Sequence, residues 1–466
     1  MRGYTRDSIM KSPKRMLGII LLVAVAIFTY TTFNRPVEKG PQGRHHGGGK
    51  LDESVIRSHK HHRNRERDYE IIPPFEMPVD DTPDDKDDNS TMAYTTVHPT
   101  TAPEIDRDRC RPHHNVAFIK VHRSGSSTVQ NIFLRYAYDH DLVVGLPRMP
   151  ESPWVGCRSV IKSSDVMELA EGVKWNIFAH HSTYNRSNFD HFMHEDTRFV
   201  GILRKPINRL RSVFYALRLE QYFPGLEGKE NDTGLMKYLR DPAHWDNKFS
   251  HPATCFEHDA CVQDCMAKDL GLPPGELDGE AIDTFIHNLG KDFTLLLILE
   301  HLNHSLVLLK RRMCWQMEDI LYWVSAEDDM TNYEEKEHFT EKMVSKYKRS
   351  SRIDYHLYEH FNASLWRQIS LEGRDFLEEV YEFERILRIV NERCQEDDGN
   401  FKIVEATEYN KEIYITWSLC TKLRFNRLAW DENIRGMQEI HYGKVESKKS
   451  FGNRWPVDVK GRNITV

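Results

Sequence analysis

The sequence of 466 residues has no excess of positive charge, no Cys-x-x-Cys pair and no internal repeat. Its 64 Lys and Arg residues stand against 71 Asp and Glu residues, and the resulting net charge of −7 excludes a globally basic nucleic-acid binder. Eight cysteines without paired spacing in a chain of this length indicate neither a disulfide scaffold nor a structural zinc cluster. A 39 % hydrophobic content excludes wholesale disorder and a multi-span membrane protein. The length fits one large domain or two domains of ordinary size, with additional terminal segments.

The N-terminal segment has the pattern of a membrane anchor. Residues 1–16 are basic, and residues 17–33 are uncharged and mostly apolar. About 17 residues at a helical rise of ~1.5 Å span roughly 26 Å, which is enough for a thin bilayer. A cleaved signal peptide is the alternative, but no small-x-small cleavage site follows the apolar run. Because positive charge precedes the span, we expect a cytoplasmic tail at 1–16, a signal-anchor at 17–33 and a lumenal remainder.

Two further features agree with a lumenal location. Six N-x-[ST] sequons are candidate glycosylation sites: Asn89, Asn185, Asn231, Asn303, Asn362 and Asn463. In an oxidising lumen the cysteines are able to pair, although the sequence does not give the connectivity.

Three regions follow the anchor. Residues 34–108 combine low hydrophobicity with dense charge, which predicts a disordered stem because such a segment cannot repay its ordering entropy. Residues 109–425 carry sustained periodic patterns and are expected to form the catalytic-sized domain. Residues 426–466 are polar and weakly patterned, and we expect a C-terminal tail on the surface.

The central region alternates strand and helix patterns. Short apolar runs predict buried strands at 115–121, 175–179, 199–203 and 293–299. Helical spacing predicts helices at 126–139, from Pro206 onward, around 306–310, and over most of 341–394 with a break near Asn362. This alternation predicts a three-layer α/β domain with a parallel sheet.

The segment Phe118–Thr128 is a candidate oxyanion site. It joins a strand, a turn with one glycine and a hydroxyl-rich helix start, where backbone N–H groups and the helix dipole bind phosphate-like groups. The chain has no Walker A motif, which disfavours an ATPase or GTPase. An ordinary Ser-capped helix is the alternative for this segment. The candidate binding residues are Lys120, Arg123, Ser124, Gly125, Ser126, Ser127 and Thr128.

A second candidate anion site follows a later strand. Arg204 lies at the expected carboxyl end of a strand, where open α/β sheets bind ligands, and Ser212 lies eight residues further on in a helix. Arginine offers a fork for a terminal phosphate. We expect Arg209 and Arg211 to form a solvated helix face. Two anion sites after two strands favour a bound group donor, such as a nucleotide, that carries two separated phosphate groups.

These segments resemble a known family of enzymes. Phe118–Thr128 is similar to the F-L-K-T-H-K-[ST]-[AG]-S-S-T loop of galactose-3-O-sulfotransferases, a family that includes galactosylceramide sulfotransferase. The resemblance continues through Ser305–Tyr322 and Asp354–Trp366 and covers roughly residues 110–395. It implies a sulfotransferase fold with a P-loop-like 5′-phosphosulfate loop. It also implies a Golgi membrane enzyme of type II topology that uses 3′-phosphoadenosine-5′-phosphosulfate and requires no metal.

The resemblance further implies sulfuryl transfer to the 3-hydroxyl of a galactose on a glycolipid or glycan. A cation must then stabilise the leaving phosphate, and Lys120 and Arg123 are the candidates. A base must accept the sugar proton, and His181 and His122 are equal candidates because imidazole titrates near neutral pH. The family usually has Lys where this chain has Arg123, and arginine cannot donate a proton at working pH.

Several alternatives remain open from the sequence. A catalytically silent lumenal carbohydrate-binding protein on the same fold is one, and a magnesium-dependent nucleotide kinase-like enzyme is another. The identity of the acceptor is also open, and we expect its selecting contacts within residues 220–290. A homodimer is possible on this evidence.

Overall fold

A computed structural model describes residues 110–442, except 157–160, 224, 230–231, 247–260, 276, 325–337 and 397–399. The predicted anchor, the stem and residues 443–466 lie outside the described residues. Within the described part of the chain, no helix is long and apolar enough to cross a membrane.

The core of the domain is a parallel sheet of four strands. These are β1 (Val116–Ile119), β2 (Ile177–Phe178), β3 (Arg198–Leu203) and β4 (Phe293–Ile298), in the spatial order β2-β1-β3-β4. All four residues of β1 are buried, as expected where helices cover both faces of a parallel sheet. The predicted parallel α/β architecture is confirmed.

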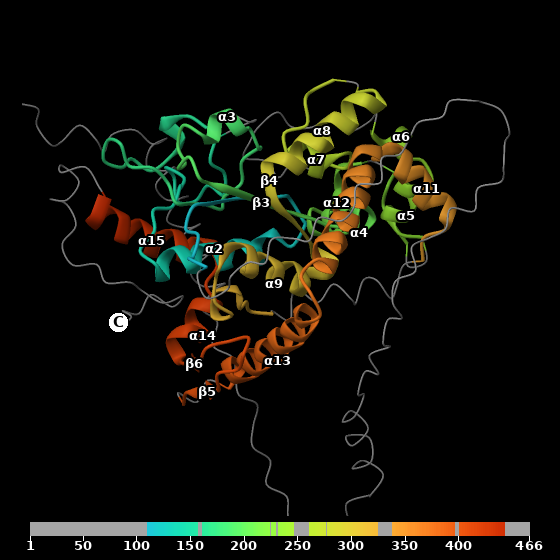
Figure 1. Ribbon diagram of the computed structural model, residues 1–466. Coiled ribbons are helices and arrows are strands. Elements are labelled where there is room, and N and C mark those ends of the chain that lie inside the picture. The colour runs from blue at the N-terminus through green and yellow to red at the C-terminus, as the bar shows by residue number, and fades with distance from the viewer. Residues whose placement is uncertain are drawn as a thin grey trace, which may run out of the picture. The chain divides into compact units, whose positions relative to one another are not determined.

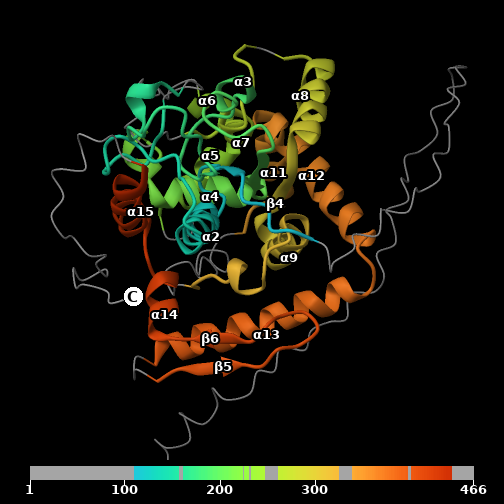
Figure 2. The ribbon, with the colours of Figure 1, turned by 60° about the vertical axis from the view of Figure 1, so that its left-hand side comes forward.

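Helices cover the two faces of this sheet (Figures 1 and 2). On one side lie α2 (Ser126–Asp139) and α9 (Leu302–Met313), and on the other side lie α3 (Arg186–Phe189) and α8 (Gly279–Asp292). Aromatic side chains join the layers. Phe133 of α2 stacks on Phe118 of β1 at 5.2 Å, whereas Phe189 of α3 packs against Phe178 of β2 and Phe199 of β3. Since successive side chains of a strand point to opposite faces, these contacts belong to different faces of the sheet.

The longer helices match the sequence pattern except at one break. α4 spans Pro206–Ala216, α11 spans Glu341–Ser350, α12 spans Arg352–Ser370 and α13 spans Asp375–Gln395. The break expected near Asn362 is wrong, because α12 continues through it. Its buried stripe, which includes Leu357, Phe361 and Leu365, outweighs the weak helix propensity of asparagine. The chain turns instead at Gly373, whose φ of 91° suits glycine.

The remaining elements are short. The helices are α5 (Gly234–Arg240), α6 (Pro242–Asp246), α7 (Cys265–Asp269) and α14 (Trp417–Leu423), and the 3-10 turns are η2 (Ser163–Asp165), η3 (Leu219–Tyr222), η4 (Leu299–His301) and η5 (Glu318–Ile320). An antiparallel hairpin of β5 (Lys402–Val404) and β6 (Ile413–Ile415) lies beside α13, as Figure 2 shows.

The region expected to be a polar tail contains a packed helix. α15 (Arg427–Tyr442) lies against α2, and its Trp430 and Ile434 belong to the main hydrophobic core. The folded domain therefore extends beyond residue 425, to at least Tyr442. The polar composition concealed this helix because Asp431, Asn433 and Gln438 are also buried and are hydrogen-bonded.

Three disulfides are present among the described residues: Cys110–Cys314, Cys261–Cys265 and Cys394–Cys420. The first ties the segment before β1 to the residue after α9, and the last joins α13 to α14. Cys157 and Cys255 lie outside the described residues. The expected pairing of cysteines is confirmed for these three pairs.

The packing of α15 leads to a stability prediction. Trp430 is 0 % exposed, so Trp430→Ala should leave a cavity and lower the free energy of unfolding by about 3–5 kcal/mol. Trp417 is 43 % exposed and provides a matched control, for which Trp417→Ala should cost less than ~1 kcal/mol. Urea unfolding of both variants measures the difference. Equal losses would contradict the packing of α15 against the core.

Candidate active site

The loop between β1 and α2 leads into a helix start that no side chain caps. Gly125 precedes α2 with a φ of 71°, and an added Cβ would lie 2.4 Å from Cδ1 of Leu299, so only glycine fits. No side chain caps the N-terminus of α2, and its first turn has no acidic residue. The first N–H groups and the positive end of the helix dipole therefore face the loop without an internal anion.

The hydroxyl groups of the loop differ in their surroundings. Ser124 is fully buried, and its Oγ has no hydrogen-bond partner among the described residues. Ser126 is also buried, Thr128 is half-buried and Ser127 is exposed. An unpartnered buried hydroxyl is costly unless a ligand satisfies it. Together with the uncapped helix start, the Ser124 hydroxyl fits an oxyanion.

The two predicted anion segments lie next to each other. Nη1 of Arg204 donates a hydrogen bond to the carbonyl oxygen of Arg123 at 3.2 Å. Nε of Arg123 donates to Oγ of Ser212, also at 3.2 Å. The end of β3, the start of α4 and the loop after β1 therefore share one edge of the sheet.

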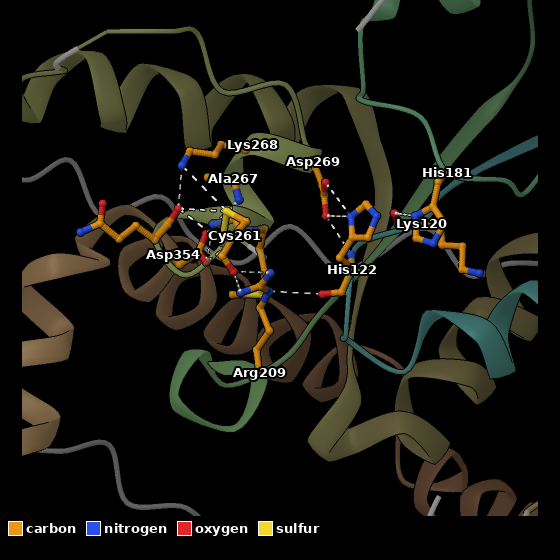
Figure 3. A network of polar contacts seen from close by, with 12 residues as sticks. Lys120, His122, His181, Arg209, Cys261, Ala267, Lys268, Asp269 and Asp354 are labelled. Atoms are coloured by element: carbon orange, nitrogen blue, oxygen red, sulfur yellow. Dashed lines mark hydrogen bonds and ion pairs between the residues drawn. A yellow bond between two sulfur atoms is a disulfide. The ribbon is translucent and has the colours of Figure 1, made fainter. Parts of the chain in front are cut away.

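Two arginines of α4 correct the sequence interpretation. Arg209 is 1 % exposed and Arg211 is 7 % exposed, so a solvated helix face at these positions is wrong. Nε of Arg209 donates to the carbonyl oxygen of His122 at 3.2 Å, and its terminal nitrogens donate to the carbonyl of Cys261 (Figure 3). The guanidinium of Arg211 lies 4.7 Å from the centroid of the Phe339 ring. Arg209 thus joins α4 to the loop and to the segment before α7.

The two candidate bases belong to one aromatic stack. The rings of His122 and His181 lie 4.0 Å apart with an interplanar angle of 13°, and the Trp154 ring lies 4.8 Å from that of His122. Nδ1 of His181 lies 3.2 Å from the carbonyl oxygen of Lys120. Burial, followed by the neighbouring His122 and Lys120, holds the pKa of His181 well below its ordinary value. His181 is therefore a neutral imidazole at physiological pH.

An aspartate that the sequence did not indicate contacts this stack. The carboxylate of Asp269, at the end of α7, lies 2.8 Å from Nδ1 of His122 and accepts the backbone N–H of His122 at 2.8 Å (Figure 3). The two residues are 147 positions apart. α7 has only five residues, and no motif or periodicity in the sequence connects it to the loop.

Lys120 points away from the solvent. Its side chain is buried, and Nζ donates to Oε1 of Gln130 on α2 at 2.6 Å. Burial, with a smaller repulsion from Arg427, lowers the pKa of Lys120 to about 7. The side chain is therefore only partly protonated near neutral pH.

A buried polar cluster on α15 lies behind this lysine. Nε2 of His180 and the carboxylate of Asp431 are 2.8 Å apart and fully buried, and Arg427 donates to the other oxygen of Asp431 at 2.6 Å. Arg427 also donates to the carbonyl oxygens of Pro150 and Ser152. The sequence missed this cluster because two of its members, Asp431 and Arg427, lie in the region expected to be a tail.

The region expected to select the acceptor contains a hollow. Its volume is about 320 Å³, and its lining includes Tyr215, Glu220, Gln221 and Lys229 near the C-terminal end of α4. Among the residues that the structure describes, no three His, Cys, Asp or Glu side chains are grouped to hold a metal ion.

Three of the predicted glycosylation sites lie among the described residues, and Asn89, Asn231 and Asn463 lie outside them. Asn185 is half-buried and its Oδ1 caps α3. Nδ2 of Asn303 donates to Glu384, and Oδ1 of Asn362 is buried. Glycosylation stays a prediction at all six positions.

Comparison with known proteins identifies the family. The family model described as galactose-3-O-sulfotransferase matches residues 81–422 of this chain. The chain belongs to the galactose-3-O-sulfotransferase family. The family expected from the loop and the segments after it is therefore confirmed, and membership supports a carbohydrate sulfotransferase.

Individual members of the galactose-3-O-sulfotransferase family show moderate similarity. Galactose-3-O-sulfotransferase 3 of Homo sapiens is 29 % identical over 311 residues, which cover 66 % of this chain and 69 % of that protein. Galactose-3-O-sulfotransferase 3 of Bos taurus is 30 % identical over 66 % of this chain and 70 % of that protein. Galactosylceramide sulfotransferase of Homo sapiens is 27 % identical over 66 % of this chain and 70 % of that protein.

The pKa of Lys120 leads to a prediction on stability. The pKa of a lysine in the unfolded chain is ~10.4, whereas the pKa of Lys120 in the folded protein is about 7. Between these values the unfolded chain binds more protons, so the free energy of unfolding should rise with pH across this window. Lys120→Met should remove this rise, which is at most ~1.4 kcal/mol per pH unit.

Urea unfolding at several pH values from ~7 to ~9.5 measures this slope. Lys348→Met is the control, because the Lys348 side chain is 53 % exposed and should leave the slope unchanged. The same slope in wild type and in Lys120→Met would show that Lys120 stays protonated in the folded protein.

Proposed function

We propose that this protein transfers the sulfuryl group of 3′-phosphoadenosine-5′-phosphosulfate to the 3-hydroxyl of a galactose on a glycolipid or glycan. Family membership supports the reaction class. The relatives that carry galactose-3-O-sulfotransferase and galactosylceramide sulfotransferase in their names support the acceptor class.

One observation carries this proposal, namely the contact of the two anion segments. The donor has a phosphosulfate at its 5′ end and a phosphate at its 3′ end, so its binding requires two anion sites within one molecule. The N-terminus of α2, with Gly125 and the unpartnered Ser124 hydroxyl, fits the 5′ group. Arg204 and Ser212 fit the 3′-phosphate, and Arg123 lies between the two sites because it contacts both residues.

The chemistry asks mainly for positioning and charge. The galactose 3-oxygen forms a bond to sulfur, and the bond from sulfur to the 5′-phosphate oxygen breaks. The electron pair leaves with adenosine 3′,5′-bisphosphate, and a histidine of the His122–His181 stack accepts the hydroxyl proton. The guanidinium of Arg123 stabilises the leaving phosphate by charge, because arginine keeps its proton at working pH. The buried side chain of Lys120 supports the base of the loop from inside the domain through its hydrogen bond to Gln130.

We also propose a lumenal location behind a single N-terminal anchor in the Golgi membrane. The uncharged segment 17–33 after a basic N-terminus supports the type II orientation. Three disulfides are typical of a protein that folds in an oxidising compartment.

Donor binding is tested at Arg204. Arg204→Ala should weaken the binding of adenosine 3′,5′-bisphosphate about 10–100-fold, because a charge-assisted contact to the 3′-phosphate is lost. Isothermal titration calorimetry measures the affinity. Arg385→Ala is the control, since Arg385 pairs with Glu382 on the surface of α13 and should not affect binding. Unchanged affinity in Arg204→Ala would overturn the donor assignment.

The acceptor is tested with a panel of substrates. With radiolabelled donor, the purified protein should sulfate galactosylceramide, lactosylceramide or a galactose-terminated glycan, and should not sulfate acceptors whose galactose 3-hydroxyl is blocked. Activity should persist in a chelator, since no metal is needed. Loss of activity in the chelator would favour a kinase-like enzyme, and sugar binding without nucleotide binding would favour a silent carbohydrate-binding protein.

A further inference from the structure

We infer that Asp269 is a positioning residue that makes His122, rather than His181, the base of the reaction. This inference rests on the proposed sulfotransferase function and adds to it a choice between the two histidines and a residue that acts through one of them.

Two contacts fix His122 to the same carboxylate. Nδ1 of the imidazole lies 2.8 and 2.9 Å from the two oxygens of Asp269, and the backbone N–H of His122 donates to the same group at 2.8 Å. Ring and main chain are therefore oriented together. The stacked ring of His181, at 4.0 Å, restricts rotation of the imidazole further.

The carboxylate also decides which ring nitrogen accepts a proton. An ionised carboxylate only accepts hydrogen bonds, so the Nδ1 atom beside it must carry the hydrogen. The lone pair of neutral His122 then lies on Nε2. This atom has no hydrogen-bond partner among the described residues, and the His122 side chain is 21 % exposed. Nε2 is thus the nitrogen left for a substrate hydroxyl.

In the proposed reaction the proton of the galactose 3-hydroxyl passes to Nε2 as the oxygen–sulfur bond forms. The resulting imidazolium carries a positive charge, and the adjacent Asp269 carboxylate stabilises it. The proton is released to solvent after the products leave, which restores neutral His122. Aspartate itself stays ionised throughout.

His181 lacks such a partner. Its Nδ1 lies against a backbone carbonyl, which has no full charge to stabilise an imidazolium. Burial keeps its pKa well below the ordinary value, so it is a weak proton acceptor. His181 serves as the flat neutral surface on which His122 stacks.

The short helix that carries Asp269 is held at both ends. Asp354 of α12 accepts the backbone N–H groups of Cys265, Met266 and Ala267 at the start of α7 (Figure 3). Asp264 in turn accepts the N–H groups of Ile353 and Asp354, so the two helix starts cap each other.

At its other end α7 is fixed by the chain after β2. The backbone N–H of Tyr184 donates to the carbonyl of Asp269 at 2.9 Å. Gly271 has a φ of 86°, and an added Cβ would lie 2.4 Å from the carbonyl oxygen of Tyr184. A five-residue helix with this many fixed contacts positions one side chain, and that side chain is Asp269.

The test is the substitution Asp269→Asn, which keeps the shape and removes the charge. We expect kcat to fall at least ~100-fold, while the affinity for adenosine 3′,5′-bisphosphate changes less than ~2-fold. Asp269 of α7 contacts the His122 ring, His181 stacks on it, and Arg209 of α4 contacts the His122 carbonyl oxygen. Only Asp269 is negative, so Asp269→Asn removes the charge that stabilises the imidazolium, and the loss should appear in kcat rather than in KM.

Two further variants separate positioning from structure. Asp292→Asn is the matched control, because Asp292 accepts a hydrogen bond from the hydroxyl of Tyr184 at 2.9 Å without contacting His122. It should leave kcat unchanged. Asp269→Glu keeps the charge and should recover part of the lost kcat. Unchanged kcat in Asp269→Asn would overturn the inference.

A measurement that does not depend on turnover distinguishes failure of this inference from failure of the proposed function. NMR of the full chain with ¹⁵N-labelled histidine should show His122 protonated at Nδ1 when neutral, and this preference for Nδ1 should weaken in Asp269→Asn. If no acceptor is sulfated but this signature is found, the proposed function fails and the Asp269–His122 pair stands. If sulfation occurs and His122 is protonated at Nε2, the inference fails alone.

Discussion

The parallel pairing of β1 with β3 governs where the functional side chains meet. Its register places Val116 opposite Arg198 and Ile119 opposite Gly201, so both strands end at the same edge of the sheet. Close packing maintains this register, because a Cβ on Gly201 would lie 2.6 Å from Cδ2 of Leu296 on β4. The loop after β1 and the helix after β3 therefore lie side by side. The pairing of the two strands, together with the side-chain hydrogen bonds of Arg123 and Arg204, joins anion segments that are distant in sequence into one site.

Polar side chains from later elements complete that edge. Asp269 of α7 contacts His122, and Asp431 of α15 contacts His180, the residue next to His181. Both carboxylates are little exposed and both contact an imidazole. Buried charges of this kind are stable only when their partners are fixed, which explains why the short α7 is capped by Asp354 and why Arg427 pairs with Asp431.

The sequence predicted the parts of the fold whose pattern is local. The buried strands and α2 appear where apolar periodicity places them, because the hydrophobic effect acts on each element separately. The adjacency of Arg123, Arg204 and Ser212 followed from the rule that ligands bind at the carboxyl ends of parallel strands.

The missed features are those in which a polar residue is buried with a distant partner. Arg209 has the appearance of a surface residue in a helix pattern, yet it satisfies two backbone carbonyls inside the domain. α15 buries Asp431 and Gln438 along with Trp430, so its hydropathy resembles that of a tail. No one-dimensional pattern encodes such pairs, because burial of a polar group depends on a partner that the fold supplies.

The placement of α15 has a consequence for biosynthesis. Gln438 exchanges hydrogen bonds with the backbone of Val144, which precedes it by 294 residues. At a synthesis rate of about 5–20 residues per second, the segment around Val144 leaves the ribosome well before α15, so the contacts of α15 form late in synthesis. Until α15 has been made, His180 lacks its carboxylate partner Asp431, and the side of α2 that α15 covers is exposed. The buried residues that α15 covers therefore stay accessible to chaperones until this helix has been made.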